Sequence, residues 1–318
     1  MVNIRLATLL VICASFALGM FGAPAEAATQ KKYVKHATTR HKVRIVHRTE
    51  VQDGDNLLLQ SSSVVVLDQS TGAFLFEKNA GAVLPIASIT KLMTAMVVLD
   101  AQLPLDETLA VADSDVDTQR GSRSRLRVGT QLSREDMLRL ALMSSENRAA
   151  SALGRHYPGG MPGFVAAMNA KAEAIGLKDT RFSDSTGLNA ANVSSARDLT
   201  KMVSAASKYP LIRELSTTPE HQVDVGGHKL SFHNTNLLVR NGAAGWDIAL
   251  SKTGFINESG KCLVMQAWFA NKPIVIVLLD SMGRLTRIAD ANRIKRWIES
   301  AGIPGARPSA SIGAPKAG

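Results

Sequence analysis

Short apolar runs, each bounded by turn-forming residues, occur near both ends of the long central region of the chain. They predict two strands at residues 63–68 and 73–77, which a polar turn containing glycine joins into a hairpin. A second hairpin is predicted at residues 263–269 and 273–280, and residues 248–255 form the strand before it. The pattern therefore places strands at both ends of one folded region.

The segments between these strands have the spacing of helices. Pro85 can start a helix, and the positions after Ser88 are apolar on nearly every side, which is typical of a buried helix. Ser133 and Asp136 form a capping box for a second helix, which ends at Ser145. Further helices are predicted at residues 149–156, 164–175 and 286–302. Strands at both ends with helices between them predict an α+β fold, within the broad α/β class, in which terminal segments close a sheet beside a helical lobe.

The first residues have the pattern of a secretory signal peptide, residues 1–27. Arg5 supplies the positive start, residues 6–21 are an apolar run, and residues 25–27 form an A-x-A cleavage site. The alternative is a retained membrane anchor, although the apolar run is at the short end for a span. We therefore expect export to the periplasm.

The charge of the chain is concentrated in one segment. Residues 28–59 are predicted to be a disordered linker, and within it residues 29–50 hold seven basic residues and one acidic residue, +6 of the formal +10. This basic arm is either a spacer or a means of loose, salt-sensitive association with an anionic envelope surface. An exported chain is not expected to bind nucleic acid. The folded domain is predicted at residues 60–302, followed by a disordered tail at residues 303–318.

Ser88 and Lys91 place a hydroxyl and an amine three residues apart. On a helix the two side chains share a face, so that Lys91 can take the proton of Ser88. A serine hydroxyl is a poor nucleophile unless a neighbouring base removes its proton. Because the helix is apolar, burial should lower the pKa of Lys91 towards that of a useful base. The pair is a candidate for nucleophilic catalysis.

Two more short motifs follow in the chain, so that the full set is Ser88-x-x-Lys91, Ser145-x-Asn147 and Lys252-Thr253-Gly254. With the sequences around them, at residues 84–98, 143–154, 232–239 and 250–266, they resemble the low-molecular-mass penicillin-binding proteins of peptidase family S11. The likeness is greatest to the D-alanyl-D-alanine endopeptidases of the penicillin-binding protein 7 type. It covers residues 61–302.

The resemblance implies a fold and a role for each motif residue. The fold is a five-stranded antiparallel sheet flanked by helices beside an all-helical subdomain, as in DD-peptidases and β-lactamases, with the site at their junction. Ser88 would be the nucleophile that forms an acyl-enzyme, Lys91 its base and Ser145 a proton relay to the leaving amine. Asn147 would bind the substrate backbone. On the residues alone, Ser145 and Asn147 fit helix capping equally well.

The resemblance also assigns the third motif. Lys252 and Thr253 would bind the substrate carboxylate, and Gly254 would allow close backbone approach. The charge of Lys252 would hold down the pKa of Lys91. The backbone N–H groups of Ser88 and Phe255 would form the oxyanion hole.

Several chemistries are not expected. The sequence contains no H-E-x-x-H or C-x-x-C motif and no phosphate-binding glycine loop, so neither a metal nor another cofactor is predicted. Signal cleavage would remove Cys13 and leave Cys262 alone, without an internal disulfide. Rapid hydrolysis of β-lactams usually needs a glutamate in an E-x-x-L-N stretch, but residues 182–189 offer only Asp184. We therefore expect β-lactams to inhibit the protein covalently.

The predicted function is that of a serine DD-peptidase acting on peptidoglycan peptides. The favoured prediction is a DD-endopeptidase that cleaves cross-links between D-Ala and meso-diaminopimelate. The alternative is a D-alanyl-D-alanine carboxypeptidase that trims pentapeptides. A remote alternative is a non-catalytic wall-binding protein, which would predict a broken motif.

Overall fold

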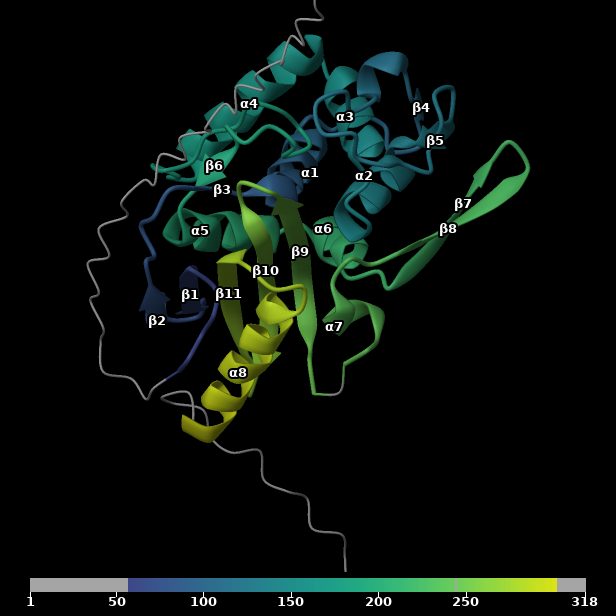
Figure 1. Ribbon diagram of the computed structural model, residues 1–318. Helices are drawn as coiled ribbons and strands as arrows, with labels where there is room; N and C mark the ends of the chain where they lie inside the picture. Colours follow the sequence, from purple (N-terminus) through teal and green to yellow (C-terminus); the bar gives the residue numbers. More distant parts are fainter. Residues whose placement is uncertain (1–56, 244, 302–318) are drawn as a thin grey trace, which may run out of the picture. The chain divides into compact units, whose positions relative to one another are not determined.

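The computed structural model describes residues 57–243 and 245–301 of the 318-residue chain (Figure 1). The predicted signal peptide (1–27), the predicted tail (303–318) and nearly all of the predicted linker (28–59) lie outside the described residues. Every described residue belongs to one structural unit.

A five-stranded antiparallel sheet forms the centre of this unit. In spatial order its strands are β2 (Ala73–Lys78), β1 (Ser63–Asp68), β11 (Lys272–Ser281), β10 (Gly260–Phe269) and β9 (Ile248–Ile256). The first strand of the chain pairs with the last, so that Ser63 lies opposite Leu279. The two predicted hairpins therefore meet inside one sheet. The prediction of five strands is confirmed, with bounds within three residues.

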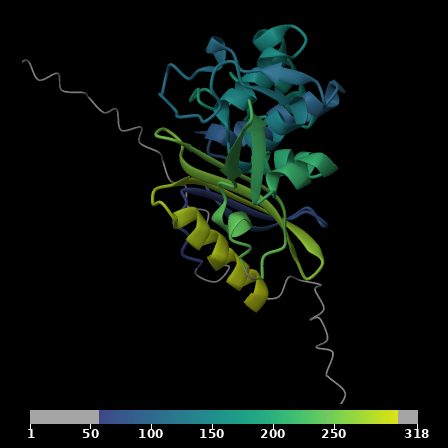
Figure 2. The ribbon, with the colours of Figure 1, turned by 90° about the vertical axis from the view of Figure 1, so that its right-hand side faces the viewer.

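Helices cover both faces of the sheet (Figure 2). Because side chains alternate along a strand, Val64 and Val66 point to the face where α8 (Thr286–Ala301) packs, and they belong to the same buried cluster as residues of α8. Val65 points to the other face, where α5 (Ala196–Ala206) and the helical lobe pack. Burial of both faces explains why the strands are continuous apolar runs instead of alternating polar and apolar positions.

The helical lobe is built around the buried helix predicted after Ser88. It comprises α1 (Thr90–Asp100), α2 (Arg134–Met143), α3 (Asn147–Arg155) and α4 (Gly160–Ala174). Nine consecutive residues of α1 are buried, because α1 contacts the other three helices. The predicted cap of α2 is confirmed, since the Ser133 hydroxyl accepts a hydrogen bond from the Asp136 N–H at 3.0 Å.

Several elements were not predicted, and most of them are short. They are β3 (Leu84–Pro85), β4 (Thr108–Ala110), β5 (Gln131–Ser133), β6 (Val193–Ser194), α5, α6 (Pro210–Ser216), α7 (Leu237–Arg240), the β7–β8 hairpin (Glu220–Val225 and His228–His233) and the turns η1 (Ala87–Ile89) and η2 (Asp113–Asp115). The hairpin projects from the rest of the fold (Figure 1). Of its residues only Val223 and Phe232 are buried, so it lacks a regular apolar pattern.

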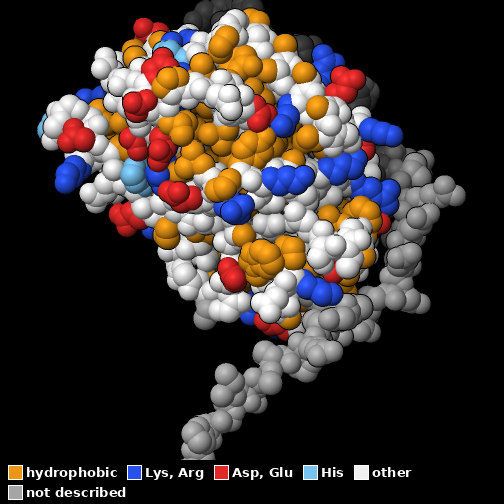
Figure 3. Space-filling view, turned by 180° about the vertical axis from the view of Figure 1, so that it is seen from behind, with side chains coloured by type: hydrophobic (Ala, Val, Ile, Leu, Met, Phe, Trp, Pro, Cys, Tyr) orange, Lys and Arg blue, Asp and Glu red, His pale blue; other side chains and the backbone are white. Residues whose placement is uncertain are grey.

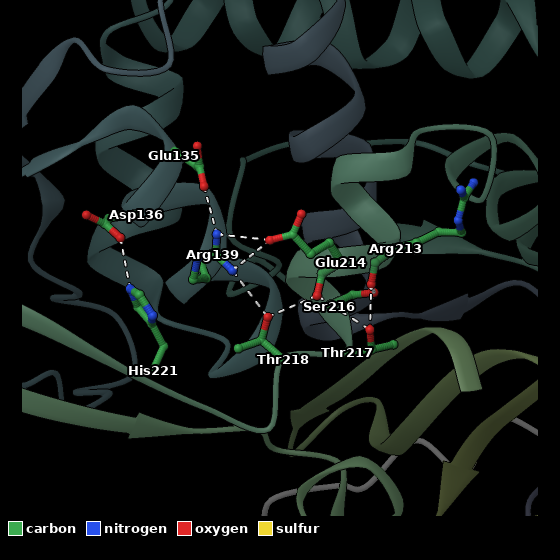
Figure 4. A network of polar contacts seen from close by, with 9 residues as sticks. All are labelled: Glu135, Asp136, Arg139, Arg213, Glu214, Ser216, Thr217, Thr218 and His221. Carbon is green, nitrogen blue, oxygen red and sulfur yellow. Dashed lines mark hydrogen bonds and ion pairs between the residues drawn. The ribbon is translucent and has the colours of Figure 1, made fainter. Parts of the chain in front are cut away.

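A polar network attaches α2 to α6 and β7 (Figure 4). Arg139 of α2 donates to Glu135 at 2.7 Å and to Glu214 of α6 at 3.2 Å. His221 Nε2 of β7 lies 2.9 Å from Asp136 Oδ1. The network fixes α2, which ends just before the Ser145-x-Asn147 motif, against the β7–β8 hairpin, which leads into residues 233–235.

Acidic and basic side chains both occur on the face seen from behind, around a group of hydrophobic side chains (Figure 3). This mixture agrees with the balance of 29 basic and 25 acidic residues from Val51 onward.

Candidate active site

Ser88 lies in η1, a single 3₁₀ turn, and not in the first turn of a long helix. The prediction that Pro85 starts the helix is wrong, because Pro85 ends β3 and the α-helix begins at Thr90. The physical reason is the backbone of Ala87, whose φ of +47° is incompatible with a regular helix. Such a conformation costs free energy and persists only where the surrounding structure holds it.

Two glycines allow neighbouring backbone to hold this turn. A Cβ on Gly187, which has φ +81°, would lie 1.9 Å from the Ala87 carbonyl oxygen. A Cβ on Gly254 would lie 2.8 Å from the Ile86 carbonyl oxygen and 3.2 Å from the Ser88 nitrogen. The turn that carries Ser88 is therefore held between a loop and β9, and neither glycine has room for a side chain.

Lys91 is fully buried in the first turn of α1, and its amine reaches three oxygen atoms. Its Nζ lies 2.9 Å from Ser88 Oγ, and it donates to Asn147 Oδ1 at 2.8 Å and to the Thr186 carbonyl at 2.6 Å. The last two oxygens can only accept. A neutral amine therefore uses its two N–H groups on them and keeps its lone pair for the Ser88 hydroxyl proton.

The electrostatics favour that neutral amine. Burial lowers the pKa of Lys91 from 10.5 to about 7, because loss of water disfavours the charged form, while Asp184 and Glu146 raise it. The pKa of Lys252 is also lowered, first by burial and then by repulsion from Lys91 and Arg287. The sequence predicted that Lys252 would hold down the pKa of Lys91. In the structure burial is the first cause of the lowered pKa of both lysines, and repulsion between them opposes their simultaneous protonation.

The connection between α2 and α3 carries Ser145 and Asn147. Ser145 has φ +58°, and its Oγ forms a hydrogen bond with Lys252 Nζ. Asn147 is the first residue of α3, and the preceding Glu146 caps that helix by accepting from the Arg148 N–H at 3.1 Å. Since Glu146 provides the cap, the side chains of Ser145 and Asn147 remain directed at the two lysines.

β9 is an edge strand of the sheet, and it brings Lys252, Thr253 and Gly254 to the site. Lys252 is buried and donates to the Thr253 carbonyl at 3.0 Å. Thr253 Oγ1 donates to Thr235 Oγ1 at 2.6 Å, which joins the segment after β8 to the site. Phe255 follows and is half-exposed. Among the described residues β9 pairs with one strand only, β10.

A pocket of about 470 Å³ opens over this arrangement. Predicted site residues that line it are Ser88, Ser145, Asn147, Thr253, Gly254 and Phe255, while Lys91 and Lys252 lie buried against its two serines. Lining residues that were not predicted are His233, Asn234, Thr235, Leu237, Arg240 and Arg287. None of these lining residues has a carboxylate, so the pocket suits an anionic ligand.

Arg287 is the most informative residue that the sequence did not reveal. It lies in the first turn of α8, and its Nε and Nη1 are buried without a hydrogen-bond partner among the described residues. Burial lowers its pKa. A buried guanidinium with unpaired nitrogens costs free energy until an anion fills the place. The apolar pattern of the helix predicts its buried side but not which polar residue faces the pocket. Thr235 could have been predicted as a site residue, because it lies within residues 232–239, which are part of the family resemblance.

Asp184, the acidic side chain considered for activating water, has a structural role instead. It accepts from the N–H groups of Thr186 and Gly187, each at 2.6 Å, and from that of Asn189 at 2.8 Å. These bonds shape the loop that reaches Lys91 and Ala87. The described residues contain no group of His, Cys, Asp and Glu side chains that could hold a metal ion. The geometry is suited to acyl transfer by a serine with a lysine base.

Comparison with known proteins agrees with this chemistry. Residues 49–283 match the model of family peptidase S11, described as D-alanyl-D-alanine carboxypeptidase. The D-alanyl-D-alanine endopeptidases of Pseudomonas aeruginosa and Escherichia coli are 54% and 50% identical over 244 residues, which is 76% of this chain and 78% of each relative. Penicillin-binding protein D2 from Listeria monocytogenes, solved in its cefotaxime-bound form, superposes with a TM-score of 0.69. It is 29% identical and covers 77% of this chain and 99% of its own.

Proposed function

Because the chain belongs to peptidase family S11 and is a serine DD-peptidase, we propose that it is an endopeptidase that cleaves D-Ala–meso-diaminopimelate cross-links in peptidoglycan. The observation that carries the proposal is the 54% and 50% identity to two D-alanyl-D-alanine endopeptidases. The second candidate is D-alanyl-D-alanine carboxypeptidase activity, which the description of the family favours. Both activities use the same nucleophile and base. The intact motifs argue against a wall-binding protein without turnover.

In the acylation step Ser88 Oγ attacks the carbonyl carbon of D-Ala, and its proton moves to Lys91 Nζ, 2.9 Å away. The carbonyl oxygen becomes an oxyanion, which the backbone N–H groups of Ser88 and Phe255 stabilise. The C–N bond then breaks. Ser145 Oγ, in contact with Lys252 Nζ, relays a proton to the leaving amine.

Deacylation reverses these roles. Water attacks the acyl-enzyme ester at the same carbon, neutral Lys91 takes the water proton, and Ser88 leaves with a proton returned to its Oγ. No lining residue of the pocket supplies a carboxylate to activate the water. A β-lactam leaves its amine tethered to the acyl group, and the acyl-enzyme is therefore long-lived. This supports covalent inhibition by β-lactams, the ligand class seen in the cefotaxime-bound relative.

The leaving group of either reaction has a carboxylate beside the scissile amide. We assign it to the cationic lining residues Arg240 and Arg287 together with Thr253, beside which Lys252 lies buried. The acyl part then extends towards Asn147. Among the described residues the outer edge of β9 is unpaired, and it gives an extended peptide a strand on which to form backbone hydrogen bonds.

Digestion of purified muropeptides distinguishes the two candidates. Cross-linked dimers and monomeric pentapeptides are incubated with the protein, with Ser88→Ala as the control, and the products are read by mass spectrometry. The proposal expects conversion of dimers to monomers, faster than pentapeptides lose their terminal D-Ala. Trimming of pentapeptides with intact dimers would establish the carboxypeptidase instead. No turnover of either substrate would contradict both.

We also propose a periplasmic location, with cleavage before Ala28. None of the described helices is long and apolar enough to cross a membrane. Any envelope association would come from the basic arm, residues 29–50, and would weaken with salt, since exposed charges are screened over about 8 Å at physiological ionic strength. Fractionation at low and high salt with N-terminal sequencing tests this. A chain that starts at Met1 or Val2 and needs detergent for release would show a retained anchor.

A further inference from the structure

A loop on the helical side of the site is ordered by one carboxylate. Asp117 accepts from the N–H groups of Gln119 and Arg120, each at 3.0 Å, and from that of Ser122 at 2.8 Å. The loop therefore holds its own shape. Its position relative to the sheet is set by the contacts of Arg120.

Arg120 joins this loop to two other segments of the chain. Its Nη1 and Nη2 donate to the two carboxylate oxygens of Glu258, each at 2.9 Å, and its Nε donates to the Leu188 carbonyl. Glu258 lies in the turn that follows β9. Leu188 lies in the loop that Asp184 shapes. A bidentate guanidinium–carboxylate pair fixes direction as well as distance, which a single hydrogen bond does not.

The loop reaches the site through Ser122. Ser122 Oγ accepts from Asn147 Nδ2 at 3.0 Å, while Asn147 Oδ1 accepts from Lys91. The side-chain amide of Asn147 is thus held at both ends. One of its two N–H groups is used by Ser122, which leaves the second for a carbonyl of the substrate.

Loss of Arg120 should affect these contacts unequally. The loop that supplies the Thr186 carbonyl to Lys91 is held by three N–H bonds to Asp184, so it keeps its shape without Arg120. Of the ion pairs between described residues, only that of Arg120 with Glu258 ties the loop that carries Ser122 to the turn after β9. Arg120 itself does not line the pocket.

We propose that Arg120 is a positioning residue for the acyl part of the substrate. Paired with Glu258, it holds Ser122 where Ser122 orients Asn147, and Asn147 binds the amide carbonyl of the peptide on the acyl side of the scissile bond. The assignment rests on the proposed function. It makes the exposed Arg120–Glu258 pair a determinant of which acyl side chains react, and not a general support for the nucleophile.

Two β-lactams with the same nucleus test this directly. Benzylpenicillin has an acylamide beside the ring, and 6-aminopenicillanic acid has a bare amine there. Arg120→Ala should lower the rate of Ser88 acylation by benzylpenicillin about tenfold, the scale of one hydrogen bond lost from the transition state. Acylation by 6-aminopenicillanic acid, followed by intact-protein mass spectrometry, should change less than about twofold, because that ligand has no acylamide for Asn147 to bind.

Further variants separate positioning from stability. Ser122→Ala should show the same selectivity, and the double variant should lose no more than the worse single one, since both act through Asn147. Arg120→Lys keeps the charge but not the bidentate geometry, so it should resemble Arg120→Ala. Arg197 and Glu77 form another exposed pair, at 2.7 Å, on α5 and β2. Arg197→Ala is the matched control and should leave the ratio of the two rates unchanged.

Each outcome decides the assignment. Equal losses with both ligands would show that Arg120 supports Lys91 or Ser88 generally, and no loss would show an ordinary surface ion pair. A changed ratio in Arg197→Ala would trace the effect to stability. Where Arg120→Ala unfolds, Glu258→Gln replaces it, because it removes one charge and retains the Leu188 contact. Failure of the unsubstituted protein to be acylated would overturn the proposed function itself.

Discussion

The lowered pKa of Lys91 makes acylation depend on pH in a way that can be measured on the unsubstituted protein. Lys91 must be neutral to take the Ser88 proton, and burial brings its pKa from 10.5 to about 7. The perturbation is a change of pH across that value. Below it the amine is protonated and has no lone pair for the hydroxyl, so acylation is slow.

The size of the effect follows from the neutral fraction. With a pKa of about 7, roughly 9% of the amine is neutral at pH 6 and roughly 91% at pH 8, so the acylation rate should rise about tenfold and then level off. With the ordinary pKa of 10.5, the neutral fraction would rise about tenfold for every pH unit from 6 to 9 without a plateau. The two cases differ in shape as well as in rate.

The assay is the initial rate of labelling by fluorescent penicillin, measured from pH 5.5 to 9.5 at constant ionic strength. The control is Lys91→Arg, which keeps a positive charge but stays protonated throughout this range. We expect this variant to lose acylation by several orders of magnitude and to show no rise near pH 7. Circular dichroism at each pH verifies that the protein remains folded.

A rate that climbs through pH 9 without a plateau would refute the reasoning, because Lys91 would then have an ordinary pKa despite its burial. A rise near pH 7, followed by a plateau, that persists in Lys91→Arg would also refute it. The titrating base would then be another group, and Lys252, whose pKa is also lowered, would be the first to examine.

Three further predictions concern single residues. Ser88→Ala should abolish the covalent penicillin adduct, and an adduct of equal intensity elsewhere would remove Ser88 from its role. Arg287→Met should slow acylation by about 10- to 100-fold, the scale of a lost charged hydrogen bond, without lowering the unfolding midpoint, because two of its buried nitrogens have no partner among the described residues. Gly187→Ala should destabilise the fold by more than about 3 kcal/mol in denaturant titration, because its Cβ would lie 1.9 Å from the Ala87 oxygen. Gly176→Ala, with similar positive φ but nothing within 4 Å, should cost only about 1 kcal/mol; equal costs would contradict the steric argument.

The sheet could be predicted because its strands are buried on both faces. Such strands are continuous apolar runs with glycine-containing or polar turns between them, and β1 was predicted with the bounds it has. The β7–β8 hairpin was missed for the opposite reason, since all but two of its strand residues are exposed or only partly buried and give no regular apolar pattern. The start of the helix after Pro85 was misplaced because the φ of Ala87 is imposed by Gly187 and Gly254, which are distant in the chain.

The sequence by itself indicated which residues are candidates for the chemistry. Ser88, Lys91, Ser145, Asn147 and the K-T-G motif could be recognised because their types and local spacings are written along the chain. The sequence also predicted the direction of the Lys91 pKa shift, whereas the tertiary structure gave its size, placed the Thr186 carbonyl on one of the Lys91 N–H groups and brought an arginine of α8 into the pocket. The physical reason is that desolvation and hydrogen-bond geometry depend on contacts between segments that lie up to nearly 200 residues apart in the chain. A local sequence pattern does not show which distant segments meet.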